Sequence, residues 1–257
     1  MTPILDHQSP REGVLQWTLR RSSARNAVNN EVMLALEDSL DQLEVASHSD
    51  AIRILVFTAD GDHFISGGDL KAFAHLKTAE EGSEMAERMK NILARIEHLP
   101  QLTICLINGD AYGGGCETAL AFDQIWIRES ARMGFIQANV GLIPGWGGYQ
   151  RLIERVGVHR AYAWLVSRHR VDAHTALSSG LVDRIFAAET FQASVDDAIA
   201  DMLVTDKDVM KTLKSIKKAY IAERKEHLSE MEAALFATLW ASDEHARRVE
   251  AFLNRSR

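Results

Sequence analysis

Hydrophobic positions along the chain fall into two patterns: short continuous runs, and positions that recur every three or four residues. Continuous runs are typical of strands covered on both faces, whereas the recurring positions are typical of helices with one buried face. The strand-like runs are residues 14–19, 52–58, 102–107, 124–127 and 133–136. The helical spacing links Val32, Leu36, Leu40 and Leu43, and again Met85, Met89, Ile92, Ile96 and Leu99. Strands that alternate with helices predict an α/β fold with largely parallel strands, so we expect the functional site in the loops at strand ends.

The pattern changes towards the C-terminus. From about residue 162 it is mostly helical, with one short strand predicted at residues 181–186. We therefore predict a core of residues 1–199 and a C-terminal helical region of residues 200–257. The spacing of the large apolar residues in that region indicates a face that packs on the core or on a neighbouring subunit. These residues are Phe236, Leu239, Trp240, Val249 and Phe252.

Composition narrows the classes of partner. The chain has 257 residues, of which 46% are hydrophobic and 25% charged, as in ordinary globular proteins. Its net charge of -7 predicts no general attraction for nucleic acid or for anionic membranes, so an anionic ligand needs a local basic cluster. There is no apolar run long enough to span a membrane, no signal-peptide pattern at the N-terminus and no disulfide framework. We expect a cytoplasmic protein that binds no metal.

The stretch that follows the run 102–107 carries the strongest chemical signal. It contains Gly113-Gly114-Gly115-Cys116-Glu117, which opens a helix-like segment. Glycines at the start of a helix leave backbone N–H groups bare at the positive end of the helix dipole, where they can hold negative charge. A second glycine turn, Ser66-Gly67-Gly68-Asp69, follows the run 52–58. Two donors from separate loops can hold one oxygen atom as an oxyanion hole. Taken alone, the glycine triplet could be a tight turn and Glu117 a helix-capping residue.

Four motifs in this order resemble those of the crotonase superfamily, also called the enoyl-CoA hydratase/isomerase family. The motifs are Ser66-Gly67-Gly68-Asp69-Leu70-Lys71, Asn108-Gly109 with Gly113-Gly114-Gly115-Cys116-Glu117, Gly141-Leu142-Ile143-Pro144-Gly145-Trp146-Gly147-Gly148 with Gln150-Arg151-Leu152, and Val171-Asp172-Ala173 leading to Gly180-Leu181-Val182. The resemblance covers nearly the whole chain. It implies a spiral of ββα units and a C-terminal helical region that mediates trimers, often paired into hexamers. It also implies acyl-CoA thioester substrates, with coenzyme A as part of the substrate and no separate cofactor.

The resemblance also assigns site residues. The N–H groups of Gly68 and Gly114 match the family's oxyanion hole, and Glu117 matches the first of its two catalytic glutamates. The position of the second glutamate holds Gln137, whose amide cannot exchange a proton as a general acid or base. Candidates for a replacement partner are Tyr112, Asp110 and His63. The residues that match the family's CoA-contacting segments are Ala24, Arg25, Asn26, Ser66, Asp69 and Leu70.

Near the C-terminus the chain departs from the family pattern. It has Arg247-Arg248 where many members have Glu-Gly, so the family's CoA contact from a neighbouring subunit is not carried over.

Several reactions fit this site, and the interpretation stays open among them. The nominal prediction is an acyl-CoA-transforming lyase with enoyl-CoA hydratase or dehydratase chemistry. Decarboxylation of a malonyl-type thioester is the next hypothesis, because loss of CO2 forms an enolate without a base, and because Phe135-Ile136-Gln137 is similar to the ethylmalonyl-CoA decarboxylase branch. Double-bond isomerisation is a third reaction. A scaffold or RNA-binding protein that has lost turnover is the alternative outside enzymology, and the retained glycines and acidic charge argue against it.

Overall fold

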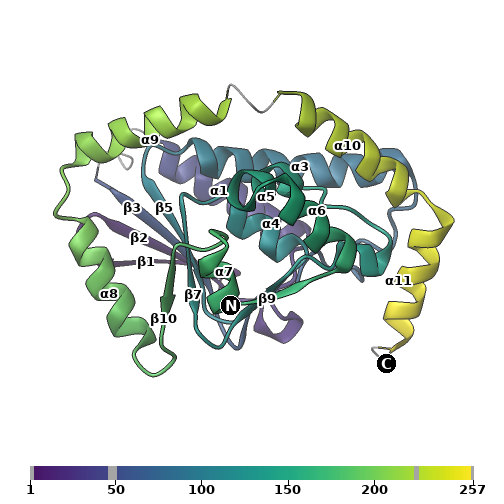
Figure 1. The fold of residues 1–257 in the computed structure, drawn as a ribbon, viewed down its shortest axis with the longest axis horizontal. Coiled ribbons are helices and arrows are strands. Elements are labelled where there is room, and N and C mark those ends of the chain that lie inside the picture. Colours follow the sequence, from purple (N-terminus) through teal and green to yellow (C-terminus); the bar gives the residue numbers. More distant parts are fainter. Residues whose placement is uncertain (1–2, 46–50, 223–225, 256–257) are drawn as a thin grey trace.

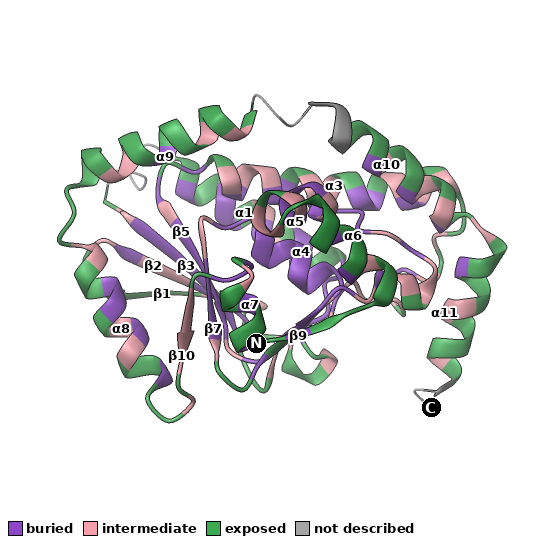
Figure 2. Cartoon of the chain, in the orientation of Figure 1, coloured by how far each residue is buried: buried purple, intermediate pink, exposed green. Residues whose placement is uncertain are grey.

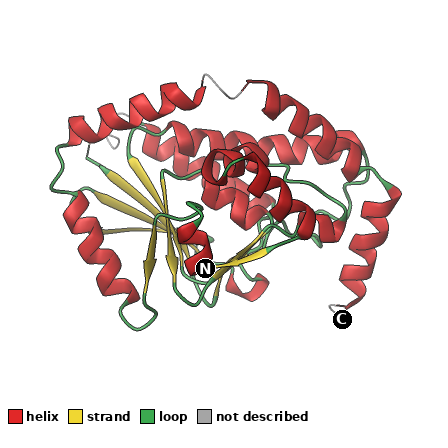
Figure 3. Cartoon of the chain, in the orientation of Figure 1, coloured by secondary structure: helices red, strands yellow, loops and turns green. Residues whose placement is uncertain are grey.

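Two β-sheets form the centre of the structure, and helices surround them (Figures 1 and 3). The computed structural model describes residues 3–45, 51–222 and 226–255. Within these ranges the larger sheet has six strands in the order β1-β2-β3-β5-β7-β10, parallel except for the β1–β2 pair. Its strands are β1 (Leu5–Arg11), β2 (Val14–Leu19), β3 (Ile54–Ala59), β5 (Leu102–Ile107), β7 (Gln124–Arg128) and β10 (Arg184–Phe186).

A smaller sheet lies beside the first. Over the described residues it has four short strands in the order β4-β6-β8-β9, of which only the β8–β9 pair is antiparallel. They are β4 (His63–Ile65), β6 (Asp110–Tyr112), β8 (Arg132–Gly134) and β9 (Arg170–Asp172). The chain places β3, β5 and β7 in the larger sheet and, directly after each, β4, β6 and β8 in the smaller one, before a helical segment follows. This is the succession of ββα units that the resemblance implies.

The helices begin and end where the sequence provides signals. Asn29 caps the first helix by accepting a hydrogen bond from the Val32 N–H at 3.0 Å. Thr78 and Glu81 form a capping box at the start of the longest helix, which ends before Pro100. The helices of the first part are α1 (Asn30–Glu44), α3 (Ala79–His98), α4 (Gly114–Leu120), α5 (Gly148–Val156), α6 (Val158–Ser167) and α7 (Ala173–Ser178), with 3-10 turns η1 (Ser22–Ala24) and η2 (Gln137–Val140). Those of the last part are α8 (Phe191–Met202), α9 (Lys207–Ala222), α10 (Glu226–Trp240) and α11 (Asp243–Arg255).

Both faces of the larger sheet are covered, as the continuous apolar runs predict. All six residues of β3 are buried. On one face Ile54, Val56 and Trp126 pack against Phe191 and Val195 of α8. On the other face β3 and β5 contribute to a larger core that includes α1, α3 and α4, so buried residues fill the centre of the molecule (Figure 2).

The sequence-based prediction differs from the structure at the three-residue strands and at the seven-residue edge strand β1, whose residues are mostly polar and exposed. It omits β1 and the strands of the smaller sheet other than β8, and it extends β8 and β10 beyond their observed ends. Three-residue strands are too short to show a hydrophobic period, since they are stabilised by pairing with neighbouring strands. None of the described helices is long and apolar enough to span a membrane.

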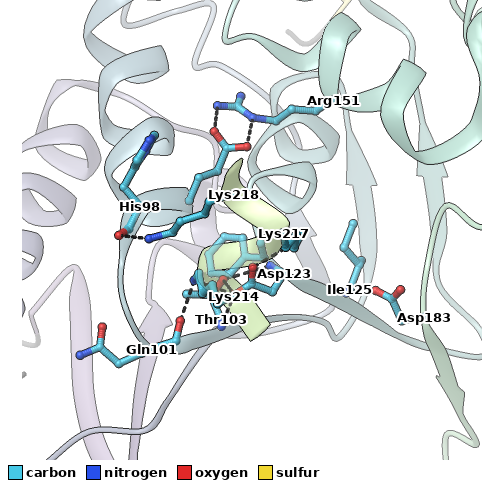
Figure 4. Close-up of polar contacts among 12 residues, drawn as sticks. His98, Gln101, Thr103, Asp123, Ile125, Arg151, Asp183, Lys214, Lys217 and Lys218 are labelled. Atoms are coloured by element: carbon cyan, nitrogen blue, oxygen red, sulfur yellow. Dashed lines mark hydrogen bonds and ion pairs between the residues drawn. The ribbon is translucent and has the colours of Figure 1, made fainter. Parts of the chain in front are cut away.

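A buried ion pair fastens α9 to the edge of the core (Figure 4). The Lys214 ammonium lies 2.6 Å from Asp123 Oδ2 and donates a hydrogen bond of 2.6 Å to the Gln101 carbonyl. The same carboxylate oxygen accepts hydrogen bonds from the Thr103 N–H and hydroxyl, at 2.9 and 3.0 Å. Burial raises the pKa of Asp123, but Lys214, Lys217 and the Thr103 N–H together lower it more. The pKa of Asp123 therefore lies below its usual value, and the carboxylate stays ionised to lower pH.

We predict that Lys214→Met destabilises the protein far more than Lys217→Met. The Lys214 side chain is 5% exposed, so its loss leaves a buried carboxylate without its main counter-charge, at a cost of about 3 kcal/mol. Lys217 pairs with the same carboxylate at 3.0 Å but is 44% exposed, and its loss should cost less than about 1 kcal/mol. Urea unfolding of both variants measures the difference. Equal losses would contradict this account.

Candidate active site

The Glu117 side chain is buried at the N-terminus of helix α5. Glu117 lies in α4, and its carboxylate reaches the turn that precedes α5. Oε2 accepts hydrogen bonds from the N–H groups of Trp146 (2.7 Å) and Gly148 (3.1 Å). Oε1 accepts one from the Gly145 N–H (3.4 Å). A negative charge at this place is stabilised by backbone donors at the positive end of the helix dipole.

Glycine is required at position 148 because Glu117 occupies the space beside it. A Cβ on Gly148 would lie 2.3 Å from Glu117 Cγ and 2.6 Å from its Oε2. The glycine turn from residue 145 to 148 therefore holds a carboxylate of the same chain.

The environment of Glu117 favours its protonated form. Burial raises the pKa of Glu117 to about 7, and the charge of Glu232 contributes to the rise. The Trp146 and Gly145 N–H groups and the Gln137 amide act in the opposite direction, because they stabilise the carboxylate. A carboxyl group with this pKa can exchange a proton at neutral pH.

Gln137 contacts Glu117 directly. Its Nε2 donates a hydrogen bond of 3.1 Å to Glu117 Oε1, and the residue is 8% exposed. Only the NH2 end of the amide can donate to a carboxylate, so the carbonyl end points elsewhere. That oxygen, Oε1, is buried and has no hydrogen-bond partner among the described residues.

Gly68 and Gly114 lie against the same indole ring. A Cβ on Gly114 would be 2.2 Å from Trp146 Cζ3, and a Cβ on Gly68 would be 3.6 Å from Trp146 Cζ2. Across the parts of the chain that are described, neither glycine N–H donates a backbone hydrogen bond to another residue. The structure thus brings together the two glycines that the sequence selects, and Trp146 forms a wall beside both.

The two loops matched to CoA contacts also meet. The Ser66 N–H donates to the Arg25 carbonyl at 3.1 Å, and the Val28 N–H donates to the Gly67 carbonyl at 2.9 Å. Asn26 is fully buried, and its amide donates to two carbonyls of the segment 60–63, both at 2.8 Å. The Asn26 side chain therefore holds the loop in place, while Ala24 and the exposed Arg25 lie at its surface side.

Leu70 lines a groove of about 640 Å³, and Asp69 precedes it in the chain. Asp69 forms an ion pair with Arg21 at 2.7 Å and accepts two backbone N–H groups of its own turn. Leu70 and Phe73 line the groove on one side, and Arg247 of α11 lines the other. Phe73 also lies 3.7 Å from the Cβ position of Gly68, so this one residue borders both the groove and that glycine.

The proposed replacement partners for the second glutamate lie elsewhere. Tyr112 donates a 2.6 Å hydrogen bond to Asp110, whose other oxygen accepts the Arg132 N–H. His63 pairs with Asp110 in the smaller sheet. Within the described ranges no hydrogen bond joins Tyr112, Asp110 or His63 to Glu117, which is bonded by Gln137 and the 145–148 turn. No group of three or more metal-binding side chains is found in the part of the chain that is described.

Sequence reasoning missed two residues of the site. The indole of Trp146 borders Gly68 and Gly114, and this contact could be predicted only from the folded loop. Glu232 of α10 is 5% exposed and accepts the N–H groups of Tyr149 and Gln150, each at 3.4 Å. Glu232 precedes the buried Phe236 and Trp240 by four and eight residues, so a carboxylate on the apolar face of a helix was the available signal.

Three comparisons relate the chain to known proteins. A family model described as enoyl-CoA hydratase/isomerase matches residues 9–257. The ethylmalonyl-CoA decarboxylase of Xenopus laevis is 31% identical over 232 residues, which cover 89% of this chain and 76% of that protein. The 2,3-dehydroadipyl-CoA hydratase of Escherichia coli is 34% identical over 181 residues, covering 70% and 69%. An enoyl-CoA hydratase structure from Mycobacterium avium subsp. paratuberculosis superposes with a TM-score of 0.86 at 22% identity, covering 97% of this chain and 99% of that one.

We predict that Gly114→Ala disturbs the site whereas Gly68→Ala leaves it folded. The added methyl at position 114 overlaps the Trp146 ring, and such overpacking costs about 1 to 3 kcal/mol. At position 68 the nearest atom is 3.6 Å away, an ordinary contact. Near-UV circular dichroism and thermal unfolding of both variants measure the effect. An unchanged tryptophan signal in the Gly114 variant would refute the proposed packing.

Proposed function

The chain belongs to the enoyl-CoA hydratase/isomerase family, and on that premise we propose that it decarboxylates a malonyl-type acyl-CoA thioester. Family membership confirms the resemblance found in the glycine motifs and makes the protein an acyl-CoA-transforming enzyme. Decarboxylation is a narrower claim than family membership. It places the second hypothesis from the sequence before the first one, hydration.

We place the thioester oxygen at the N–H groups of Gly68 and Gly114. Both N–H groups lack backbone acceptors within the described residues, and both glycines lie beside Trp146. The CoA portion would lie along the joined loops of Arg25 and Ser66 and the groove that begins at Leu70. A groove of about 640 Å³ is within the range of small-molecule sites.

The proposed reaction needs no base. The bond between the α-carbon and the substrate carboxylate breaks, CO2 leaves, and the electron pair of that bond forms the enolate. Its oxygen is stabilised by the two N–H groups, each typically contributing about 3 to 4 kcal/mol to transition-state stabilisation. The α-carbon then takes one proton, which yields the acyl-CoA product.

Glu117 is the proposed proton donor for this last step. Its pKa of about 7 leaves a substantial protonated fraction at neutral pH, and the proton is regained from solvent after each turnover. Glu117 therefore does not have to serve as both acid and base on one substrate.

The observation that carries the proposal is the contact between Gln137 and Glu117. A hydratase of the two-glutamate type uses two carboxylates, and here the second position donates an amide hydrogen bond to the first. Loss of CO2 followed by one protonation requires only one proton donor, which is the role proposed for Glu117. The similarity to an ethylmalonyl-CoA decarboxylase supports the same reaction class.

Hydration of an enoyl-CoA is the second candidate, and one observation favours it. Gln137 Oε1 is a buried acceptor with no partner in the described part of the chain, so it could hold a hydrogen of a water molecule beside Glu117. The similarity to 2,3-dehydroadipyl-CoA hydratase is consistent with this reaction.

Assembly and location are also proposals. Exposed apolar residues at helical spacing along α9, Val209, Leu213, Ile216 and Tyr220, support association into trimers or hexamers. The sequence composition supports a cytoplasmic location.

We predict that the wild-type protein releases CO2 from methylmalonyl-CoA or ethylmalonyl-CoA and that it hydrates crotonyl-CoA slowly or not at all. Incubation with each thioester followed by mass spectrometry measures both reactions. Glu117→Gln should lower the rate of decarboxylation by about 10²-fold or more, because a general acid contributes that much. Turnover of crotonyl-CoA without CO2 release from either malonyl thioester would replace decarboxylation by hydration.

We also predict that turnover falls as the pH rises through about 7. Glu117 must carry a proton to protonate the enolate, and above its pKa the protonated fraction falls about tenfold per pH unit. The pH dependence of kcat for CO2 release, measured with solvent viscosity as a control for product release, provides the test. A kcat that stays constant up to about pH 9 would exclude Glu117 as the donor.

A further inference from the structure

Two buried carboxylates share the N-terminus of helix α5. Glu117 takes the N–H groups of Trp146 and Gly148, and Glu232 takes those of Tyr149 and Gln150, the next two along the chain. The two side chains come from α4 and α10, which are far apart in sequence. Like charges brought together in a buried place disfavour each other's ionised form.

We infer that Glu232 is a positioning residue of the site, whose negative charge beside the α5 N-terminus raises the proton affinity of Glu117. The inference rests on the proposed function and deepens it, because the Glu232 charge adds to burial in letting a glutamate with four hydrogen-bond donors act as an acid. Glu232 does not touch the glycines or Gln137 through any hydrogen bond found in the described residues, so its effect acts through Glu117.

Two cations, Arg151 and Lys90, carry charges that act on this pair of carboxylates. Arg151 of α5 is a buried cation. Its Nε and Nη2 donate hydrogen bonds to Glu97 at 3.0 and 2.9 Å, and its Nη1 donates to the Trp146 carbonyl at 2.6 Å. Lys90 of α3 is the other cation whose charge acts on Glu232. Arg151 pairs directly with Glu97, and its charge also acts on Glu117 and Glu232, where it opposes part of the repulsion between the two carboxylates.

The shift of Glu117 agrees with this geometry. Burial raises the pKa of Glu232, while the Tyr149 and Gln150 N–H groups and the charges of Arg151 and Lys90 lower it. Burial raises the pKa of Glu117 first, and the Glu232 charge raises it further. Coupling of this kind is reciprocal, so each group changes the proton affinity of the other by the same factor.

Glu232→Gln tests the inference. Glutamine keeps an oxygen that can accept the Tyr149 and Gln150 N–H groups but removes the charge. Infrared titration of the protonated carboxyl C=O band reports Glu117 directly, and the Glu117→Gln difference spectrum assigns its signal. We expect the Glu117 midpoint to fall by about one pH unit in Glu232→Gln. Glu230→Gln, an exposed charge removal on the same helix, should leave the midpoint unchanged.

Two further measurements keep the test decisive. If Glu232→Gln does not fold, the midpoint of Glu232 in the Glu117→Gln protein reports the same coupling and should lie below its wild-type value. Glu232→Asp, which retains the charge, should keep the Glu117 midpoint near that of the wild type. A Glu117 midpoint that is unchanged by Glu232→Gln, or a Glu232 midpoint that is unchanged by Glu117→Gln, overturns the inference.

The titration is independent of turnover. A protein that decarboxylates no malonyl thioester but shows the midpoint shift would disprove the proposed function and leave the role of Glu232 standing. Where turnover is present, the falling limb of the pH profile should move to lower pH in Glu232→Gln and stay in place in Glu230→Gln.

Discussion

The burial of the Glu117 carboxylate at the start of α5 is the constraint on which the site depends. A carboxylate without partners in the interior is strongly unfavourable, so the chain must supply donors from outside α4. It supplies them from the turn at residues 145–148, and Gly148 leaves the space that the side chain needs. The glycines of the 145–148 turn are therefore explained by Glu117, and hydrogen bonds to this buried carboxyl group join α4 to α5 in addition to apolar packing.

Sequence reasoning was most successful where a physical requirement has a local pattern. The long helices α1 and α3 carry a clear apolar period, and the buried strands β3 and β5 carry continuous apolar runs. The strands of the smaller sheet have three residues each, and their formation depends on neighbours that the sequence does not place. The same distinction applies in the site. Gly68 and Gly114 can be selected because bare N–H groups are a local property, but the wall formed by Trp146 depends on how three loops meet.

Gln137 illustrates how a single replacement changes the chemical capacity of a site without opening it. An amide of nearly the same shape as glutamate still fills its buried position and still reaches Glu117, now as a donor at 3.1 Å. What is lost is the ability to exchange a proton. A reaction that needs only one proton transfer is compatible with this change, whereas syn addition of water must recruit another group.

The C-terminal helices take part in the site more closely than a division of the chain near residue 200 suggests. His245 of α11 lies 2.6 Å from the Val140 carbonyl, and Arg248 donates to the Ala138 carbonyl at 3.1 Å. Both contacts hold η2, whose first residue is Gln137, while Glu232 of α10 binds the first turn of α5. The segment from residue 137 to 150 is thus held between α4 on one side and α10 and α11 on the other. Arg248, which departs from the family pattern, donates a hydrogen bond within its own chain, so this C-terminal difference in sequence supports the turn that carries Gln137.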